Sequence, residues 1–159
     1  VTIGELKAQP TVDFVKDLLT RLDKVVVFFQ YHATADIVEA GLRSYGLVRY
    51  DGNTGKDDRK RYVDRFQTDD SCRVMLMQIK TAVGLPLWAA DTTVFVEASW
   101  VPGDLEQAEA RVDIVHGTPQ PTMHYYMTIH GSVDEHQLRR TLEKSDVIQQ
   151  VVNPAAAIL

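Results

Sequence analysis

The chain has 159 residues, 45% of them hydrophobic and 25% charged, which is the composition of one ordinary soluble domain with a sizeable core. Its formal net charge of -5 at pH 7 is the wrong sign for a domain that grips nucleic acid by bulk electrostatics, so we expect any DNA contact to be local. No apolar run approaches about 18 residues and no charged leader precedes an apolar segment, so the sequence predicts neither a membrane span nor a signal peptide.

The chain holds one cysteine, Cys72, and five histidines. A single cysteine excludes an internal disulfide and a cysteine-based zinc site, and the histidines lack metal-ligand spacing, so no metal site is predicted. Because the chain opens on Val1 rather than Met, we expect a piece of a larger protein. Within it we expect one domain over residues 1–152 and a flexible tail over 153–159.

Five short runs rich in Val, Phe, Tyr and Met predict strands, and they alternate with stretches of helical spacing. In chain order these are a strand over 24–29, a helix over 34–45 that stops at Gly46, a weaker strand over 46–50, and a helix over 54–66 that begins with Thr54 and Asp57 as a capping box. Strands over 72–77, 92–98 and 123–129 follow, and a last helix over about 133–152 carries Leu138, Leu142, Val147, Ile148 and Val151 inward.

All six prolines fall outside these elements. Strands that alternate with helices imply a mainly parallel sheet with helices on both faces, and the unbroken apolar run over 25–29 predicts the central strand. The fold class expected is therefore α/β, a three-layer αβα domain.

The segment "DLEQAEARVDIVHG", residues 104–117, has helical spacing. Gln107 and Arg111 are four residues apart and Ile114 is three further on, so the spacing predicts that all three lie along one helical face. Ligands of such α/β sheets usually bind at the loops that follow the strands. Those loops read "QYHAT", "DGNTG", "QIKTAVGLPLWAAD" and "SWVPGDLEQAEAR".

The order and spacing of these segments over 24–152 resemble the C-terminal RecA-like lobe of superfamily-two helicases, specifically the Swi/Snf-type DNA-dependent ATPases. The phrases "KVVVFFQYHATADIVEAGL", "RYDGNTGKDDRKRYVDRF" and "AADTTVFVEASWVPGDLEQAEAR" are similar to consecutive motifs of that family. Of these three segments, the last is most similar in sequence to the annealing-helicase branch of the family. The resemblance implies a RecA-like fold.

The resemblance also implies a nucleotide site. Its motif VI helix reads Gln-x-x-x-Arg-x-x-Arg, which Gln107 and Arg111 match, whereas Ile114 stands where the family has an arginine finger. That finger is worth roughly 10³ to 10⁵ in rate in nucleotide hydrolases. In motif V, Gly84 and Leu85 fit the family pattern and the residues before them do not. By resemblance, Arg111 and Gly84 contact nucleotide.

For DNA, the resemblance favours contacts by Gln30, Tyr31, His32, Asn53, Thr54 and Lys80. It implies ATP and Mg²⁺ between two lobes of the parent protein, with the N-terminal RecA-like lobe as partner. The chain has no phosphate-binding Gly-x-x-x-x-Gly-Lys-Ser/Thr loop, so we expect no tightly bound cofactor, no ATP hydrolysis and only weak DNA binding by this chain alone. The resemblance also implies that the protein is nuclear if it comes from a eukaryote and cytoplasmic otherwise.

Two alternatives stay open. One is a pseudo-helicase lobe that binds DNA or protein without ATP turnover, and the other is an unrelated small-molecule-binding α/β domain. Residue by residue, Arg111 is also compatible with a solvated arginine or with a salt bridge to Glu109 or Asp113, residues 30–32 with a simple chain turn, and residues 53–54 with helix capping. Both tryptophans, 88 and 100, are predicted to be packing anchors.

Overall fold

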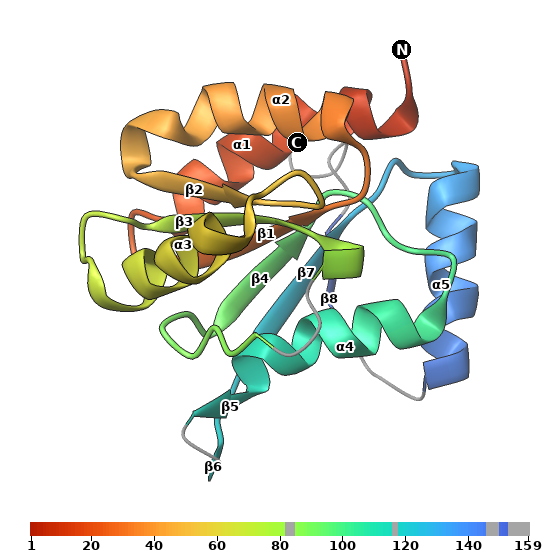
Figure 1. Cartoon of the computed structure of the whole chain (residues 1–159). Coiled ribbons are helices and arrows are strands. Elements are labelled where there is room, and N and C mark those ends of the chain that lie inside the picture. The colour runs from red at the N-terminus through yellow and green to blue at the C-terminus, as the bar shows by residue number, and fades with distance from the viewer. Residues whose placement is uncertain (82–84, 116–117, 146–149, 153–159) are drawn as a thin grey trace.

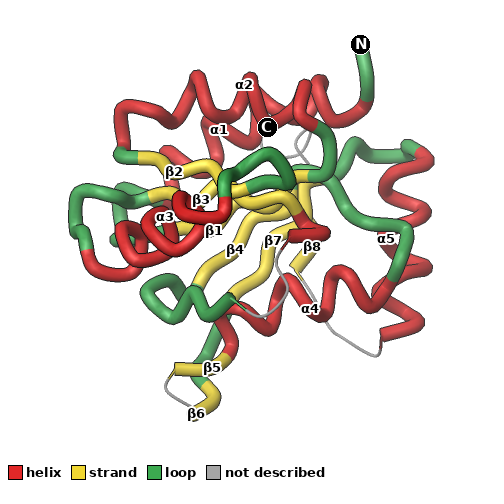
Figure 2. The backbone as a smooth tube through the Cα atoms, viewed as in Figure 1, coloured by secondary structure: helices red, strands yellow, loops and turns green. Residues whose placement is uncertain are grey.

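The chain folds around a six-stranded parallel sheet, in a computed structural model that describes residues 1–81, 85–115, 118–145 and 150–152. The strand order is β2-β3-β1-β4-β7-β8 (Figures 1 and 2). The strands are β1 Val25–Phe29, β2 Leu47–Tyr50, β3 Val74–Gln78, β4 Thr92–Phe95, β7 Met123–Met127 and β8 Gln150–Val152. Every pairing in this sheet is parallel, and β1 lies inside it between β3 and β4, so the predicted parallel α/β fold is confirmed.

Helices cover both faces of the sheet (Figure 1). The helices are α1 Ile3–Leu18, α2 His32–Leu42, α3 Lys56–Thr68, α4 Pro102–Asp113 and α5 Val133–Ser145, with short 3₁₀ turns η1 Arg43–Tyr45 and η2 Ile79–Thr81. The apolar residues of α1 and α2 pack in one core cluster, and those of α3, α4 and α5 pack in another on the opposite face. The predicted three-layer arrangement is therefore present. No helix of the described segments is long and apolar enough to span a bilayer.

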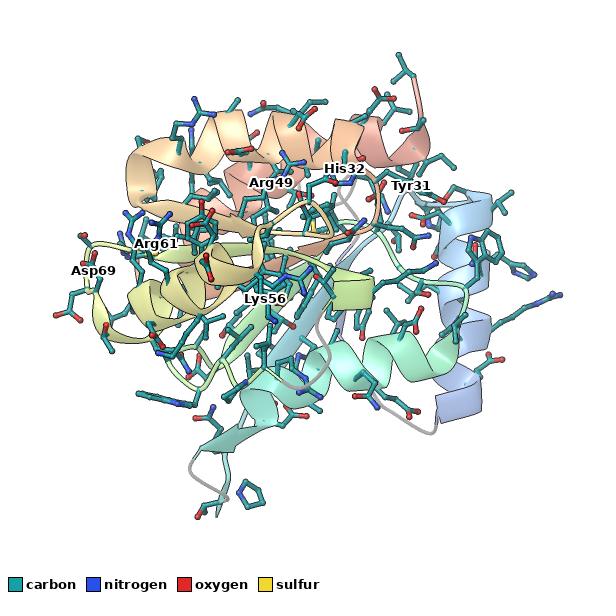
Figure 3. The ribbon with its side chains drawn as sticks, in the orientation of Figure 1. Tyr31, His32, Arg49, Lys56, Arg61 and Asp69 are labelled. Carbon is teal, nitrogen blue, oxygen red and sulfur yellow. The ribbon has the colours of Figure 1, made fainter. Side chains whose placement is uncertain are left out.

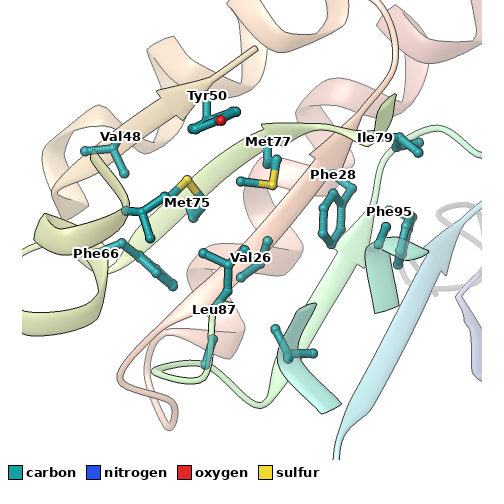
Figure 4. Close-up of a cluster of buried hydrophobic side chains, with 14 of the residues drawn as sticks. Val26, Phe28, Val48, Tyr50, Phe66, Met75, Met77, Ile79, Leu87 and Phe95 are labelled. Carbon is teal, nitrogen blue, oxygen red and sulfur yellow. The ribbon is translucent and has the colours of Figure 1, made fainter. Parts of the chain in front are cut away.

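The central strand supplies both cores because successive side chains of a strand point to opposite faces. Val26 and Phe28 enter the cluster shown in Figure 4, while Val25, Val27 and Phe29 enter the other. All five are fully buried. This explains why the apolar run is unbroken rather than alternating.

The first helix, α1, is absent from the sequence prediction. It begins with a capping box, in which Thr2 Oγ1 accepts the Glu5 amide and the Glu5 carboxylate accepts the Thr2 amide. Pro10 lies inside this helix, Pro102 opens α4 and Pro119 lies in the short strand β6, so the expectation that every proline falls outside the elements is wrong.

The end of the chain also differs from the prediction. The last helix ends at Ser145, and Val151 lies in β8, which pairs with β7, so the expected helix over 133–152 is too long. Of the residues expected to face inward, Leu138 is buried in the core. Residues 147 and 148 lie outside the described segments, as does the tail over 153–159. A three-residue strand leaves too little pattern to distinguish it from a helix end.

The turn before β2 is as predicted. Gly46 closes η1 with φ of 77°, and a Cβ there would lie 1.8 Å from the Ser71 carbonyl oxygen. The Gly46 carbonyl accepts the amides of Arg73 and Val74, which starts β3 in register beside β2. Only glycine tolerates both the positive φ and this close approach.

Candidate interlobe nucleotide site and nucleic-acid edge

The loops that follow β1, β2, β3 and β4 lie at the carboxyl edge of the sheet, because all four strands run parallel. They carry the residues for which the sequence predicts contacts with DNA. Two side chains hold these loops together: Gln78, half-buried at the end of β3, and Glu97, buried just after β4.

Glu97 follows β4 and is 6% exposed. Its Oε2 accepts the backbone amides of Gln30 at 2.9 Å and Tyr31 at 3.0 Å, and its Oε1 accepts the Thr34 hydroxyl at 2.8 Å. A buried carboxylate that accepts three hydrogen bonds fixes its partners firmly. The β1–α2 loop is therefore attached to the end of β4.

Gln78 links three loops at the same edge. Its Nε2 donates to the Gln30 carbonyl at 3.2 Å, and its Oε1 accepts the Gly52 amide at 3.1 Å. The side-chain amide of Gln78 supplies both a donor and an acceptor. It therefore connects the loop after β3 to the loops after β1 and β2.

His32 lies in an acidic environment beside Arg49 (Figure 3). Arg49 donates to Asp36 at 2.7 Å, Glu39 at 2.8 Å and Asp51 at 3.0 Å, and its Nη2 lies 2.9 Å from His32 Nδ1. Arginine only donates, so His32 Nδ1 is the acceptor in this contact. Burial lowers the pKa of Arg49, but the hydrogen bonds to these three carboxylates outweigh it, so the pKa is raised above its usual value.

This cluster has three carboxylates and two arginines, Arg49 and the more exposed Arg43, which lies 3.7 Å from Glu39, so its local charge remains negative. It disfavours a phosphate next to His32, whereas the sequence predicts a DNA contact there. Tyr31, which precedes it, is exposed and its hydroxyl accepts from Gln30 Nε2 at 3.3 Å.

The turn after β2 uses its polar groups internally. Asp51 Oδ1 accepts the Asn53 amide at 2.8 Å, and Thr54 Oγ1 accepts the Asp51 amide at 2.9 Å. The N-cap of α3 is Gly55, without a side-chain cap, so the predicted capping box of Thr54 and Asp57 is wrong.

Gln107 and Arg111 do come together on α4. Arg111 Nε donates to the Gln107 carbonyl at 2.8 Å, and its Nη2 donates to Gln107 Oε1 at 3.1 Å. Within the described residues Arg111 has no carboxylate within 4 Å, so the alternative of a salt bridge to Glu109 or Asp113 is wrong. Partial burial lowers the pKa of Arg111, but an arginine remains a cation at neutral pH.

The helix ends before Ile114. Its last residue is Asp113, and Ile114 begins the two-residue strand β5, which pairs antiparallel with β6, Thr118–Pro119. The expectation that Ile114 continues the helical face of Arg111 is therefore wrong. The chain leaves the helix here because β5 and β6 form a hairpin, and Gln120 donates its amide to the Asp113 carbonyl.

The motif V segment contacts helix α4 through the short turn η2. Lys80 is exposed on η2, which packs against α4, and the Leu87 amide donates to the Arg111 carbonyl at 2.8 Å. Lys80 and Arg111 thus come from adjacent elements. Gly84 lies outside the described residues.

Glu109 anchors the same helix from its inner side. It accepts a hydrogen bond from the Tyr126 hydroxyl on β7, and burial raises its pKa to about 7. Burial and the Glu109 charge together raise the pKa of Tyr126. Glu109 therefore helps to position α4, which carries Arg111.

Glu97, Gln78 and Arg49 were missed by sequence reasoning. Glu97 was read as part of a strand and Arg49 as part of a weak one, and nothing near them in sequence indicates their partners. A charged residue at the end of an otherwise apolar strand is the signal that marks Glu97. Among the described residues, no group of three or more His, Cys, Asp and Glu side chains could hold a metal ion.

Comparisons with known proteins agree with this geometry. The helicase conserved C-terminal domain family matches residues 10–113. The SWI/SNF-related matrix-associated actin-dependent regulator of chromatin subfamily A-like protein 1 of Drosophila melanogaster is 30% identical over 152 residues, which are 93% of this chain and 20% of that protein. The Xenopus tropicalis protein of the same name is 33% identical over 92% of this chain and 16% of its own length.

Two further likenesses extend the comparison. The chromatin-remodeling ATPase INO80 of Sclerotinia sclerotiorum is 33% identical over 88% of this chain and 8% of its own length. The crystal structure of the C-terminal part of the Fun30 ATPase domain matches with a TM-score of 0.71 and 27% identity, over 80% of this chain and 43% of that one. The chain thus spans a fifth or less of the length of these curated relatives.

The predicted fold and the predicted resemblance to Swi/Snf-type proteins are both confirmed. Because the matched range runs from the middle of α1 to the end of α4, the chain belongs to the helicase conserved C-terminal domain family, and it has the RecA-like fold of the C-terminal part of the Fun30 ATPase domain.

Proposed function

We propose that this chain is the second motor lobe of a Swi/Snf-type DNA-dependent ATPase. The observation that carries the proposal is the pairing of Gln107 and Arg111 on α4, beside η2 with its exposed Lys80. Among the described residues, the Arg111 guanidinium donates hydrogen bonds only to Gln107 of the same helix, so it can turn to a phosphate without breaking a salt bridge. In this role Arg111 stabilises charge on the transferred phosphoryl group and Gln107 orients Arg111.

ATP and Mg²⁺ would be held mainly by the N-terminal lobe of the parent protein, which supplies the phosphate loop and the acidic magnesium ligands. The present chain contributes one cation, Arg111, from the other side of the nucleotide. Such a divided site explains why we expect no ATP hydrolysis by the chain alone.

DNA would contact the same edge through a few local groups. Lys80 and Asn53 are exposed there, and Gln30, Tyr31 and Thr54 lie in loops that Glu97 and Gln78 hold in place. The acidic cluster around Arg49 directs phosphates away from His32 and toward Lys80. Lys80→Ala should weaken DNA binding and reduce its salt dependence by about one counterion, because each phosphate contact releases condensed ions.

A pseudo-helicase lobe without ATP turnover is the second candidate, and the lost finger position favours it. An Ile114→Arg variant of the two-lobe protein separates the two, with DNA-stimulated ATP turnover and melting temperature as readouts. A working motor turns over ATP without the substitution, and a rise with Ile114→Arg shows that residue 114 still reaches the phosphates. If the two-lobe protein has an intact phosphate loop and still hydrolyses no ATP, the lobe acts as a scaffold and the second candidate is correct.

A further inference from the structure

The two ends of helix α4 are held in different ways. At its start, the Ser99 hydroxyl donates to Asp104 at 2.7 Å and accepts the Val101 amide at 3.1 Å, so these contacts are local. Trp100, in the same segment, is 64% exposed, so the prediction that it is a packing anchor is wrong. At the other end, where the chain leaves the helix for the β5–β6 hairpin (Figure 1), hydrogen bonds arrive from other segments. That end carries Arg111 in the last turn of the helix.

Three carbonyls of this last turn accept hydrogen bonds from outside the helix. The last four carbonyls of any α-helix have no partner within it, so a helix end frays unless other groups bind them. The Arg111 carbonyl accepts the Leu87 amide at 2.8 Å. Gln120 donates its side-chain Nε2 to the Val112 carbonyl and its backbone amide to the Asp113 carbonyl, the latter at 2.9 Å. Gln120 alone therefore holds two of the three carbonyls.

The Asp113 side chain connects the same turn to the sheet. An acidic residue is unfavourable at a helix C-terminus, where the helix dipole is negative, so the place of Asp113 is explained by its contacts. Its Oδ1 accepts the Thr122 hydroxyl at 2.7 Å and His124 Nε2 at 3.1 Å. His124, on β7, is 6% exposed, and its Nδ1 lies 2.6 Å from the Thr93 hydroxyl on β4. A chain of hydrogen bonds thus runs from the end of α4 to two strands.

Arg111 therefore has a fixed backbone and a side chain that can turn. Among the described residues its guanidinium donates only to Gln107, while its carbonyl and those of the next two residues are bound to other segments. A misplacement of about 1 Å at a reacting centre can cost about 10²-fold in rate. A cation that acts on a phosphoryl group from the end of a helix needs such a support, because that end is where a helix frays most readily.

We propose that Gln120 and His124 are positioning residues for Arg111. Gln120 holds the last carbonyls of α4, and His124 holds Asp113, so that together they fix the point from which the Arg111 guanidinium reaches the phosphate. The inference rests on the proposed function, since it takes Arg111 as the cation that acts on ATP. Gln120 and His124 act through Arg111 and need no contact with the nucleotide.

The test is DNA-stimulated ATP turnover by the parent protein that contains both lobes. Gln120→Met keeps the length of the side chain and the backbone amide, and removes the Nε2 donor. It should lower kcat at least tenfold and change the KM for ATP less than twofold, because Arg111 acts in the transition state and the N-terminal lobe holds most of the ATP.

Substitutions of His124 test the second tie. His124→Phe keeps a ring of similar size without a donor, and should lower kcat at least fivefold. His124→Gln restores a side-chain N–H that can reach Asp113, and should keep at least half of the parent's turnover. Rescue by glutamine shows that the hydrogen bond, rather than the bulk of the ring, places the helix end.

Two controls separate positioning from a loss of folded protein. In an Arg111→Ala background, Gln120→Met and His124→Phe should have no further effect on turnover, because both act through Arg111. Gly46→Ala strains a turn beside Ser71, far along the sheet from α4, and should change kcat of the folded protein less than twofold. Hydrogen exchange of the parent protein should quicken in Gln120→Met at the last turn of α4 and stay unchanged in the central strands.

Three results overturn the inference. If Arg111→Ala lowers turnover while Gln120→Met and His124→Phe stay within twofold of the parent, the role of Arg111 stands and its positioning by these residues does not. If Gln120→Met lowers turnover further in the Arg111→Ala background, it acts by another route. Full turnover in Arg111→Ala, or no turnover in the unsubstituted parent, overturns this inference together with the proposed motor function.

Discussion

Replacing Glu97 by alanine should release the β1–α2 loop from the sheet. The substitution removes three hydrogen bonds to a buried carboxylate and leaves the backbone amides of Gln30 and Tyr31 without their acceptor. Hydrogen bonds to a charged group contribute about 1.5–3 kcal/mol each, and removing one member of a buried charged network costs about 3–5 kcal/mol. We therefore expect the free energy of unfolding to fall by about 3–5 kcal/mol.

Urea unfolding followed by circular dichroism measures this loss. Each kcal/mol lowers the melting temperature of a domain of this size by about 2–4 °C, so Glu97→Ala should melt on the order of 10 °C lower. Glu97→Gln keeps the side-chain shape and one carbonyl acceptor, and should cost about 1 kcal/mol. Glu143→Ala, an exposed glutamate of α5, is the matched control and should change stability by less than about 0.5 kcal/mol. A loss below about 1 kcal/mol for Glu97→Ala would refute the role assigned to this carboxylate.

Three further predictions concern the fold around the site. Burial raises the pKa of Glu109 from 4.5 to about 7, so the folded state binds this proton more tightly than the unfolded state. Its contribution to stability is thus full below about pH 4.5 and is lost as the pH rises through about 7. At about 1.4 kcal/mol per pH unit this amounts to about 3 kcal/mol, so urea titrations at several pH values should show that Glu109→Gln removes about 3 kcal/mol of pH-dependent stability, and an unchanged pH dependence would contradict this. Lys24→Met should cost about 2–4 kcal/mol by calorimetry, because the Lys24 ammonium donates to three backbone carbonyls at and after the end of α3, at 2.5, 2.7 and 2.8 Å. An equally stable variant would mean that those carbonyls find other donors. Gly46→Ala should cost about 2 kcal/mol or more, because the new Cβ meets the Ser71 carbonyl at positive φ, and a melting temperature equal to the parent's would show that the turn adapts.

The parallel sheet was predictable because its strands are marked by local composition. β1 is apolar at every position, and Gly46 marks the turn before β2. By contrast, α1 carries Lys7 and Thr11 on its buried side, where a sequence pattern expects apolar residues. Lys7 is tolerated there because Asp134, 127 residues away, pairs with it, and such a partner cannot be read from local spacing.

The site was predictable where it depends on spacing within one helix. Gln107 and Arg111 are four residues apart and do form a pair. Ile114 was placed on the same face by the same rule, but the helix ends one residue earlier, and helix ends are the least certain feature of any periodic pattern. Glu97 and Arg49 act through contacts between distant segments, so only the fold reveals them.

The most direct test of the proposed motor function is DNA-stimulated ATP turnover by the two-lobe parent protein carrying Arg111→Ala. Arg111 is the cation that this chain offers to the phosphates, so its loss should reduce turnover at least a hundredfold, the scale on which a cation that stabilises the transferred phosphoryl group acts. Arg21→Ala, which changes an exposed arginine beyond the end of α1, is the matched control and should turn over ATP like the parent protein. Melting temperatures of both variants should equal that of the parent. Unchanged turnover in Arg111→Ala would contradict the assignment of α4 to the nucleotide site.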